Sequence, residues 1–195
     1  MVALAAAGVG RNVQLIGKTG DDAVADALLR ELGRCGVGHV ASLRDPGRST
    51  PVVDLAAPEG EEEAVGSAAS AAPAADRPVL DAQDVDLALR YLTEFGVLVV
   101  AEQLDAETGR VVAGAAAWSG SELVMILAPG SVVPDGLPPG AVVFEAPDDD
   151  PDGTFATLVG TFAAALDDGA EAGAAFRSTL AADGWTESGQ EPSEA

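Results

Sequence analysis

The sequence has few aromatic residues, one cysteine and one histidine. Aromatic residues make up 4% of the chain, and alanine and glycine are abundant within its 48% apolar share, so we expect a core built mainly from valine, leucine and alanine. Cys35 is the single cysteine, which excludes an internal disulfide and fits a reducing cytoplasm. His39 is the single histidine, and without a second histidine or a cysteine cluster it gives no basis for a metal site.

Positive charge is also scarce. Lysine and arginine together number 10 against 32 aspartates and glutamates, for a net charge of −22. This acidic balance argues against a nucleic-acid partner and against an anionic membrane, which both bind clustered positive charge. No apolar run approaches the ~20 residues of a membrane helix. The apolar start lacks the basic segment of a signal peptide, so we interpret it as part of a helix and expect a cytoplasmic protein.

The periodicity predicts one α/β domain over residues 1–183, with a mainly parallel sheet flanked by helices. Residues 61–78 contain a low-complexity stretch that we expect to be a flexible loop, and 184–195 should be a disordered tail. The expected helices are 2–8, 22–34, 81–95, 106–118, 153–168 and 170–182. The expected strands are 12–16, 97–100, 123–127 and 141–145.

Residues 150–169 form the most informative segment. Apolar residues recur with helical spacing, and they are Phe155, Leu158, Val159, Phe162 and Leu166. Gly153 opens the expected helix, and Thr154 or Asp152 is a candidate cap. A glycine turn before a helix N-terminus presents unpaired N–H groups, which is a general arrangement for binding an anion such as phosphate.

A second glycine-rich segment, from residue 17 to residue 22, reads Gly-Lys-Thr-Gly-Asp-Asp. We expect a turn here, carrying Gly17, Lys18, Gly20 and Asp21, that leads into the helix over 22–34. Val24, Leu28, Leu29 and Leu32 should face inward in that helix. Arg44 to Arg48 should form a turn between two short strands.

Both segments resemble motifs of the ribokinase/PfkB carbohydrate kinase family. The matching residues of the C-terminal signature are Asp150, Gly153, Thr157, Val159, Gly160 and Phe162. Those of the N-terminal segment are Gly17, Lys18, Gly20, Asp21 and Asp22, followed by the leucines of the next helix. Thr50 matches the family's threonine, and residues 58–61 resemble a hairpin turn of the family, which implies a hairpin turn there. The resemblance implies a three-layer ribokinase-like fold, shortened here, and an ATP- and magnesium-dependent transfer of phosphate to a sugar.

The sequence departs from the family at the positions that carry the chemistry. Ala156 stands where the family has its catalytic aspartate, the general base for the sugar hydroxyl, and Phe155 replaces the second glycine of the anion hole. Gly153, Thr154 and Phe155 would be the remnant of that anion hole. The family's Asn-Glu motif and adenine-side motifs are not recognisable. ATP and magnesium would be cofactors only if activity is retained.

Met1 falls within the family's first helix, so its preceding strand has no counterpart here. We therefore expect an exposed sheet edge that favours a homo-oligomer or a protein partner. Three interpretations remain open: a catalytically inactive pseudokinase that binds a ligand or partner, an atypical sugar kinase, and a decayed fragment of one.

Other candidate sites are weaker. Asp148-Asp149-Asp150-Pro151-Asp152-Gly153 resembles the start of a calcium-binding loop, but Val159 falls where the loop needs an acidic side chain. Asp150 or Asp152 could replace the lost base, although both precede the turn. We expect Cys35 to be buried and Trp118 and Trp185 to anchor helix ends.

Overall fold

The computed structural model describes residues 1–52 and 76–182 of the 195-residue chain. The helices are α1 (Val2–Gly8), α2 (Ala23–Arg34), α3 (Ala82–Tyr91), α4 (Ala106–Ser119), α5 (Thr154–Asp167) and α6 (Ala172–Ala182). The strands are β1 (Val13–Gly20), β2 (Val37–Asp45), β3 (Val97–Val100), β4 (Glu122–Leu127) and β5 (Val142–Glu145). The hairpin turn predicted over 58–61, most of the predicted loop, Trp185 and the predicted tail lie outside the described residues.

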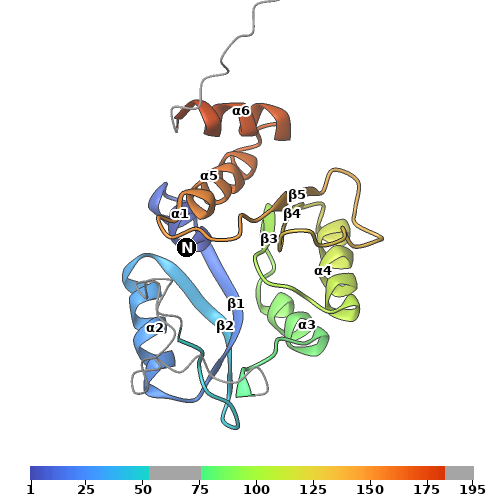
Figure 1. Cartoon of the computed structure of the whole chain (residues 1–195). Helices are drawn as coiled ribbons and strands as arrows, with labels where there is room; N and C mark the ends of the chain where they lie inside the picture. Colours follow the sequence, from blue (N-terminus) through green and yellow to red (C-terminus); the bar gives the residue numbers. More distant parts are fainter. Residues whose placement is uncertain (53–75, 183–195) are drawn as a thin grey trace, which may run out of the picture.

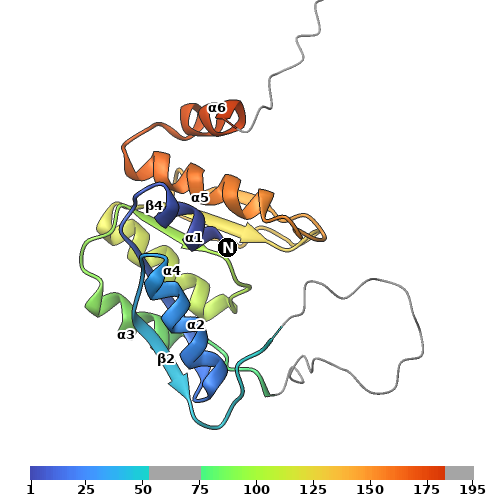
Figure 2. The ribbon, with the colours of Figure 1, turned by 90° about the vertical axis from the view of Figure 1, so that its left-hand side faces the viewer.

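The second half of the chain is a three-layer α/β/α arrangement (Figures 1 and 2). β3, β4 and β5 form a parallel sheet in that order. Because side chains alternate along a strand, β4 serves both faces. Leu123 and Met125 pack with α3 and α4, whereas Val124 packs with α5 and α6. This confirms the predicted α/β class with parallel strands flanked by helices.

The first half contributes a separate two-stranded sheet. β1 and β2 are parallel and are joined through α2, which begins at the N-cap Asp22. The strands therefore form two sheets among the described residues, not the single sheet that the sequence predicted. β3 shows the consequence: its run of four apolar residues is typical of a strand covered on both faces, yet only Val100 is buried.

The turn predicted at residues 17–20 is wrong. Gly17 and Lys18 continue β1 and pair with Ser42 and Leu43, because β2 extends to Asp45 and offers a partner along the whole length. Gly17 and Gly20 are not among the glycines with positive φ. Gly20 is needed for close approach instead, since a Cβ there would lie 2.6 Å from the Arg48 carbonyl oxygen.

Several apolar side chains are more exposed than their spacing predicted. Val24 and Leu28 are exposed, while Ala25 and Leu32 are the buried residues of α2. The reason is geometric: α2 covers only a two-stranded sheet, so only a narrow stripe of the helix finds a partner. Trp118 is 90% exposed and anchors nothing, because it lies on the outer face of α4 near its C-terminal end.

α1 and α5 cross closely at Gly160. A Cβ at Gly160 would lie 2.6 Å from both the Ala5 Cβ and the Val2 carbonyl oxygen. The helices lie side by side in Figure 2, and the glycine allows their backbones to meet. No helix in the described ranges is long and apolar enough to span a bilayer.

Candidate functional site

The segment before α5 forms a tight turn as predicted. The Gly153 N–H donates to the Asp150 carbonyl oxygen at 3.1 Å, which closes a four-residue turn. Gly153 then takes a left-handed conformation, with φ +67°, and serves as the N-cap of α5. A residue with a Cβ is strained there, so the glycine is required by the backbone.

The N-terminus of α5 is already occupied by a carboxylate of the chain itself. The Phe155 N–H donates to Asp150 Oδ1 at 3.0 Å, and the Ala156 N–H donates to Asp150 Oδ2 at 2.9 Å. Both bonds satisfy N–H groups that a helix N-terminus otherwise leaves free. The N-cap position is thus Gly153, while the side chain that bonds to the helix end is that of Asp150, and the prediction of Thr154 or Asp152 as the cap is wrong. The turn explains this, because it folds Asp150 back over the first turn of the helix.

Apolar side chains close the rest of this site. Ala156 is 7% exposed, and its methyl group cannot accept a proton. Phe155 is half-buried and meets Phe144 edge-on, with ring centroids 6.3 Å apart. The Met1 side chain lies against the turn, since a Cβ at Gly153 would be 2.8 Å from Met1 Cε. The predicted anion-hole remnant is thus a carboxylate-capped helix end lined by apolar groups.

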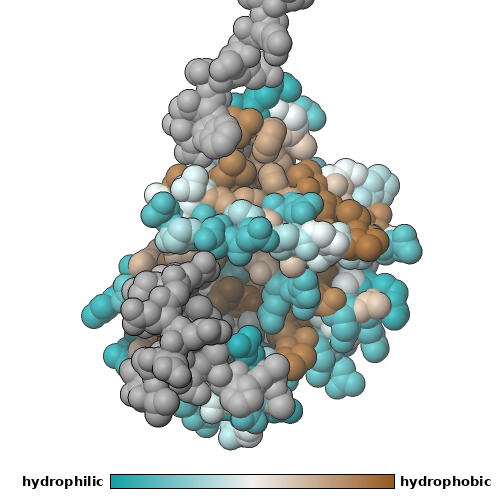
Figure 3. Space-filling model, viewed as in Figure 1, coloured by the Kyte–Doolittle hydropathy of each residue, from teal (hydrophilic) through white to brown (hydrophobic). Residues whose placement is uncertain are grey.

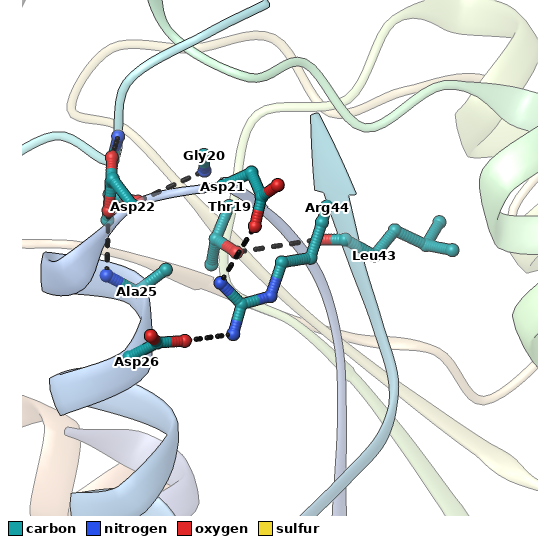
Figure 4. A network of polar contacts seen from close by, with 9 residues as sticks. Thr19, Gly20, Asp21, Asp22, Ala25, Asp26, Leu43 and Arg44 are labelled. Carbon is teal, nitrogen blue, oxygen red and sulfur yellow. Dashed lines mark hydrogen bonds and ion pairs between the residues drawn. The ribbon is translucent and has the colours of Figure 1, made fainter. Parts of the chain in front are cut away.

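A polar network organises the end of β1 and the start of α2 (Figure 4). Asp22 accepts hydrogen bonds from the Thr50 N–H at 2.7 Å and the Ala25 N–H at 2.8 Å. The Thr50 hydroxyl in turn accepts from the Gly20 N–H at 3.0 Å. Donors from Thr50 and Ala25 favour the charged carboxylate and lower the pKa of Asp22. Its contribution to stability is present above the unfolded-state pKa and is lost as pH falls through the folded-state value.

Arg44 reaches from β2 across this network. Its guanidinium lies 2.6 Å from Asp26 and 3.5 Å from Asp21, and Figure 4 shows it between the two carboxylates. Asp21 thus pairs with Arg44 within the chain. Gly20, Asp21 and Asp22 read as a structural junction between β1 and α2.

Lys18 joins the two halves of the chain. Its ammonium donates to Asp84 Oδ2 of α3 at 2.7 Å, and the two side chains are only 19% and 18% exposed. The hydrogen bond to Asp84 raises the pKa of Lys18 above its ordinary 10.5. Asp84 also accepts from the Asp81 N–H as part of the capping box of α3. Lys18 of the family-like segment is therefore engaged in an ion pair within the chain.

Lys18→Met is expected to lower the free energy of unfolding by about 1 kcal/mol at pH 7, between the values for exposed and fully buried pairs. Because the folded-state pKa of Lys18 is raised, the stabilisation is fully present below pH 10.5 and lost as pH rises through the folded-state pKa. Urea titrations of wild type and variant from pH 7 to pH 11 measure this. The two curves should converge only in the alkaline range.

Arg90→Met is the matched control. Arg90 pairs with Asp86 on the same helix, but their side chains are 73% and 53% exposed. We expect a loss of about 0.5 kcal/mol or less for that exposed pair. Equal losses from both variants would contradict the role given to the Lys18–Asp84 pair.

The remaining candidates do not assemble into a metal or nucleophile site. In residues 1–52 and 76–182, no group of three or more His, Cys, Asp or Glu side chains is placed to hold a metal ion. His39 lies within β2, against Gly33 of α2. Cys35 is exposed and not buried as predicted, because it falls at the C-cap of α2, beyond the stripe that faces the sheet.

The two family-like segments remain apart. The end of β1 and the start of α5 lie at different places in the molecule in both views (Figures 1 and 2). Lys18 bonds to α3, and Asp150 bonds within its own segment. Sequence reasoning missed that Asp150 is the capping group, although the Asp-Pro-Asp-Gly pattern is a typical signal for the turn that brings it there.

Comparison with known proteins gives a likeness of fold. No family model matches the chain, and no curated protein matches it. Among solved structures, the chain is similar to the crystal structure of Sa239, with a TM-score of 0.63 and 12% identity over 100% of this chain and 83% of that one. It shares the fold of that protein. Fructokinase from Xylella fastidiosa, solved alone and with bound ATP, gives a TM-score of 0.46 and 17% identity over 92% of this chain and 55% of that one.

Proposed function

We propose that this chain is a non-catalytic homologue of the ribokinase/PfkB carbohydrate kinases, a pseudokinase that acts by binding a ligand or partner protein. The resemblance of its two glycine-bearing segments to the family motifs supports the relationship. The main observation in support of a non-catalytic protein is the environment of the α5 N-terminus. Asp150 accepts from the N–H groups of Phe155 and Ala156, and Ala156 lies buried where the family has its general base.

The charge at the α5 N-terminus also supports the proposal of a non-catalytic protein. Phosphoryl transfer depends on positive or dipolar groups that stabilise the transferred phosphate. Here the Asp150 carboxylate already accepts from two N–H groups of the helix end, so an incoming phosphate would meet a like charge there. No base is available to the sugar hydroxyl from Ala156, and Asp150 is committed to the backbone. ATP and magnesium are accordingly not assigned as cofactors.

Calorimetric titration of the full chain with ATP, ADP and MgCl₂ tests the proposal, with thermal unfolding recorded alongside. We expect no saturable heat and no rise in Tm with either nucleotide, because a ligand stabilises only the state that it binds. Ala156→Asp should not create ATP consumption dependent on ribose or fructose, since Phe155 and the Asp150 cap remain. Sugar-dependent turnover by wild type or by this variant would overturn the proposal.

Two further variants test whether Asp150 stabilises the helix through its hydrogen bonds or only through its negative charge. Asp150→Ala should lower the free energy of unfolding by about 1 kcal/mol, as expected for loss of a helix cap. Asp149→Ala removes an equal charge from the exposed neighbouring position and should leave stability unchanged within about 0.5 kcal/mol. Equal effects of the two variants would show that Asp150 has no special part in closing the site.

A further inference from the structure

An apolar groove of about 540 Å³ separates the two sheets, a size typical of ligand pockets. β1 borders it with residues 13–16 and β3 with residues 97–99, whereas β2 and β4 contribute nothing to its lining. The groove therefore lies along the edge of each sheet that has no partner strand. Figure 3 shows hydrophobic side chains set back near the middle of this face, where Figure 1 separates β1 from β3.

The edge of β3 leaves backbone groups unpaired. The Gly96 carbonyl oxygen accepts from the Glu122 N–H at 2.9 Å, so Gly96 faces β4. The backbone N–H and C=O groups of successive residues point to opposite sides of a strand. Those of Leu98 therefore also face β4, and those of Val97 and Val99 face the groove. Among the described strands, β3 pairs with β4 alone and β1 with β2 alone. Unpaired backbone groups at an apolar edge favour pairing with another strand.

The two free edges begin at the same end of the groove. Arg11, just before β1, lies 3.5 Å from Asp167 at the end of α5. Gly96, just before β3, lies so close to Asp167 that a Cβ would be 2.8 Å from Oδ1. Both strands thus start beside one residue and run from it along the groove. A single extended segment between them could pair with both and join the two sheets into one.

The walls define the side chains that such a segment needs. Small residues of α1 and α5 line one face of the groove, including Ala6, Ala163 and Ala164, and they leave room for large side chains. Leu89 and Leu92, from α3 and the residue after it, line another part. A strand that is apolar on both faces fits this lining.

The charge of the chain indicates which kind of segment the groove would bind. A second copy of this chain would also carry a net charge of −22, and like charges oppose self-association. Glu94 and Asp167 are acidic residues of the lining, and Arg11 is already paired with Asp167 and Asp168. Because the Arg11–Asp167 pair offsets one acidic charge of the lining, Glu94 and the overall charge of −22 are what favour a positively charged segment.

We propose that this groove binds an extended segment of a partner protein, apolar on both faces and flanked by basic residues, which adds as a strand between β1 and β3. This is strand addition at a sheet edge, in which main-chain hydrogen bonds supply affinity and the lining supplies specificity. The groove would be the site at which the proposed pseudokinase binds its partner protein, so this inference rests on the proposed partner-binding function.

The probe is a fluorescein-labelled peptide with six alternating valine and isoleucine residues between two lysines at each end. Fluorescence anisotropy with the full chain should show saturable binding. A peptide with proline at its two central positions has the same charge but lacks two N–H donors, and it should bind at least tenfold more weakly. A peptide with glutamate in place of every lysine should also lose at least tenfold at low salt.

Amide hydrogen exchange locates the bound strand without any variant. Exchange at Val97 and Val99 should slow at least tenfold when the valine–isoleucine peptide binds, whereas Leu98, already bonded to β4, should not change. Binding without protection of Val97 and Val99 would overturn the proposal, as would failure of the folded chain to bind the peptide. Protection of both amides in the free protein, together with a dimer in sedimentation, would identify a second copy as the occupant and also overturn it.

Val99→Pro removes an N–H that faces the groove and leaves the hydrogen bonds to β4 in place. It should weaken peptide binding at least tenfold, while Val99→Thr, which keeps the N–H, should stay within twofold of wild type. If Val99→Pro does not fold, the exchange measurement and the proline peptide decide the question. These tests use no nucleotide and no sugar, so sugar-dependent ATP turnover in the earlier assay would refute the pseudokinase proposal without bearing on the groove.

Discussion

Phe162→Ala is expected to lower the free energy of unfolding by about 3–5 kcal/mol, a large part of the stability of a small domain. Phe162 is 1% exposed and lies where α5 meets the sheet. Its ring meets Phe144 of β5 edge-on, with centroids 5.2 Å apart. Removing the ring leaves a cavity inside this aromatic cluster, and the surrounding structure relaxes only partly around such a cavity. Equilibrium unfolding in urea measures the loss.

Phe176→Ala is the matched control within the same aromatic cluster. Phe176 of α6 is 39% exposed, and its ring centroid lies 6.4 Å from that of Phe162. We expect a loss of about 1–2 kcal/mol, because less apolar surface leaves contact with the protein. Equal losses from the two variants would mean that burial in this cluster does not decide the effect.

Gly160→Ala is expected to lower the free energy of unfolding by about 2–3 kcal/mol through overpacking. The added methyl group would meet the Val2 carbonyl oxygen and the Ala5 Cβ at 2.6 Å and the Ala6 nitrogen at 3.0 Å. Two of these are backbone atoms, so relief requires α1 to move away from α5. Thermal unfolding measures the change.

Gly114→Ala makes the same chemical change in α4, where a Cβ would meet nothing within 4 Å. Alanine is the better helix former, so this variant should gain about 0.5–1 kcal/mol. The same substitution is thus predicted to lower the free energy of unfolding at Gly160 and to raise it at Gly114. A stabilising effect at Gly160 would contradict the close crossing of α1 and α5.

The sequence predicted the helices and the second-half strands well, because their signals are local. The stripe that includes Val159 and Phe162 has helical period, and Asp81 is followed three residues later by Asp84, which completes a capping box. The four-residue strand over 97–100 was predicted with the bounds that it has. In each case the residues within one element carry enough information to specify it.

The errors concern partners that are distant in the sequence. Gly17 and Lys18 were predicted as a turn because glycine is common in turns, but pairing with Ser42 and Leu43 makes them a strand. The division into two sheets was missed for the same reason, because local periodicity predicts strands but not which strands pair with one another. At the candidate site, the residues of the turn were predicted, but the capping role of Asp150 was not, because it depends on how the turn folds back.

Lys18 is the single lysine of the chain, and its ammonium is held against Asp84 where β1 meets α3. Reagents that acylate lysine therefore have one side-chain target in this sequence. Acylation of Lys18 requires its contact with Asp84 of α3 to open. The acylation rate of Lys18, compared with that of lysine in a short peptide, therefore reports how often this contact between the two halves opens.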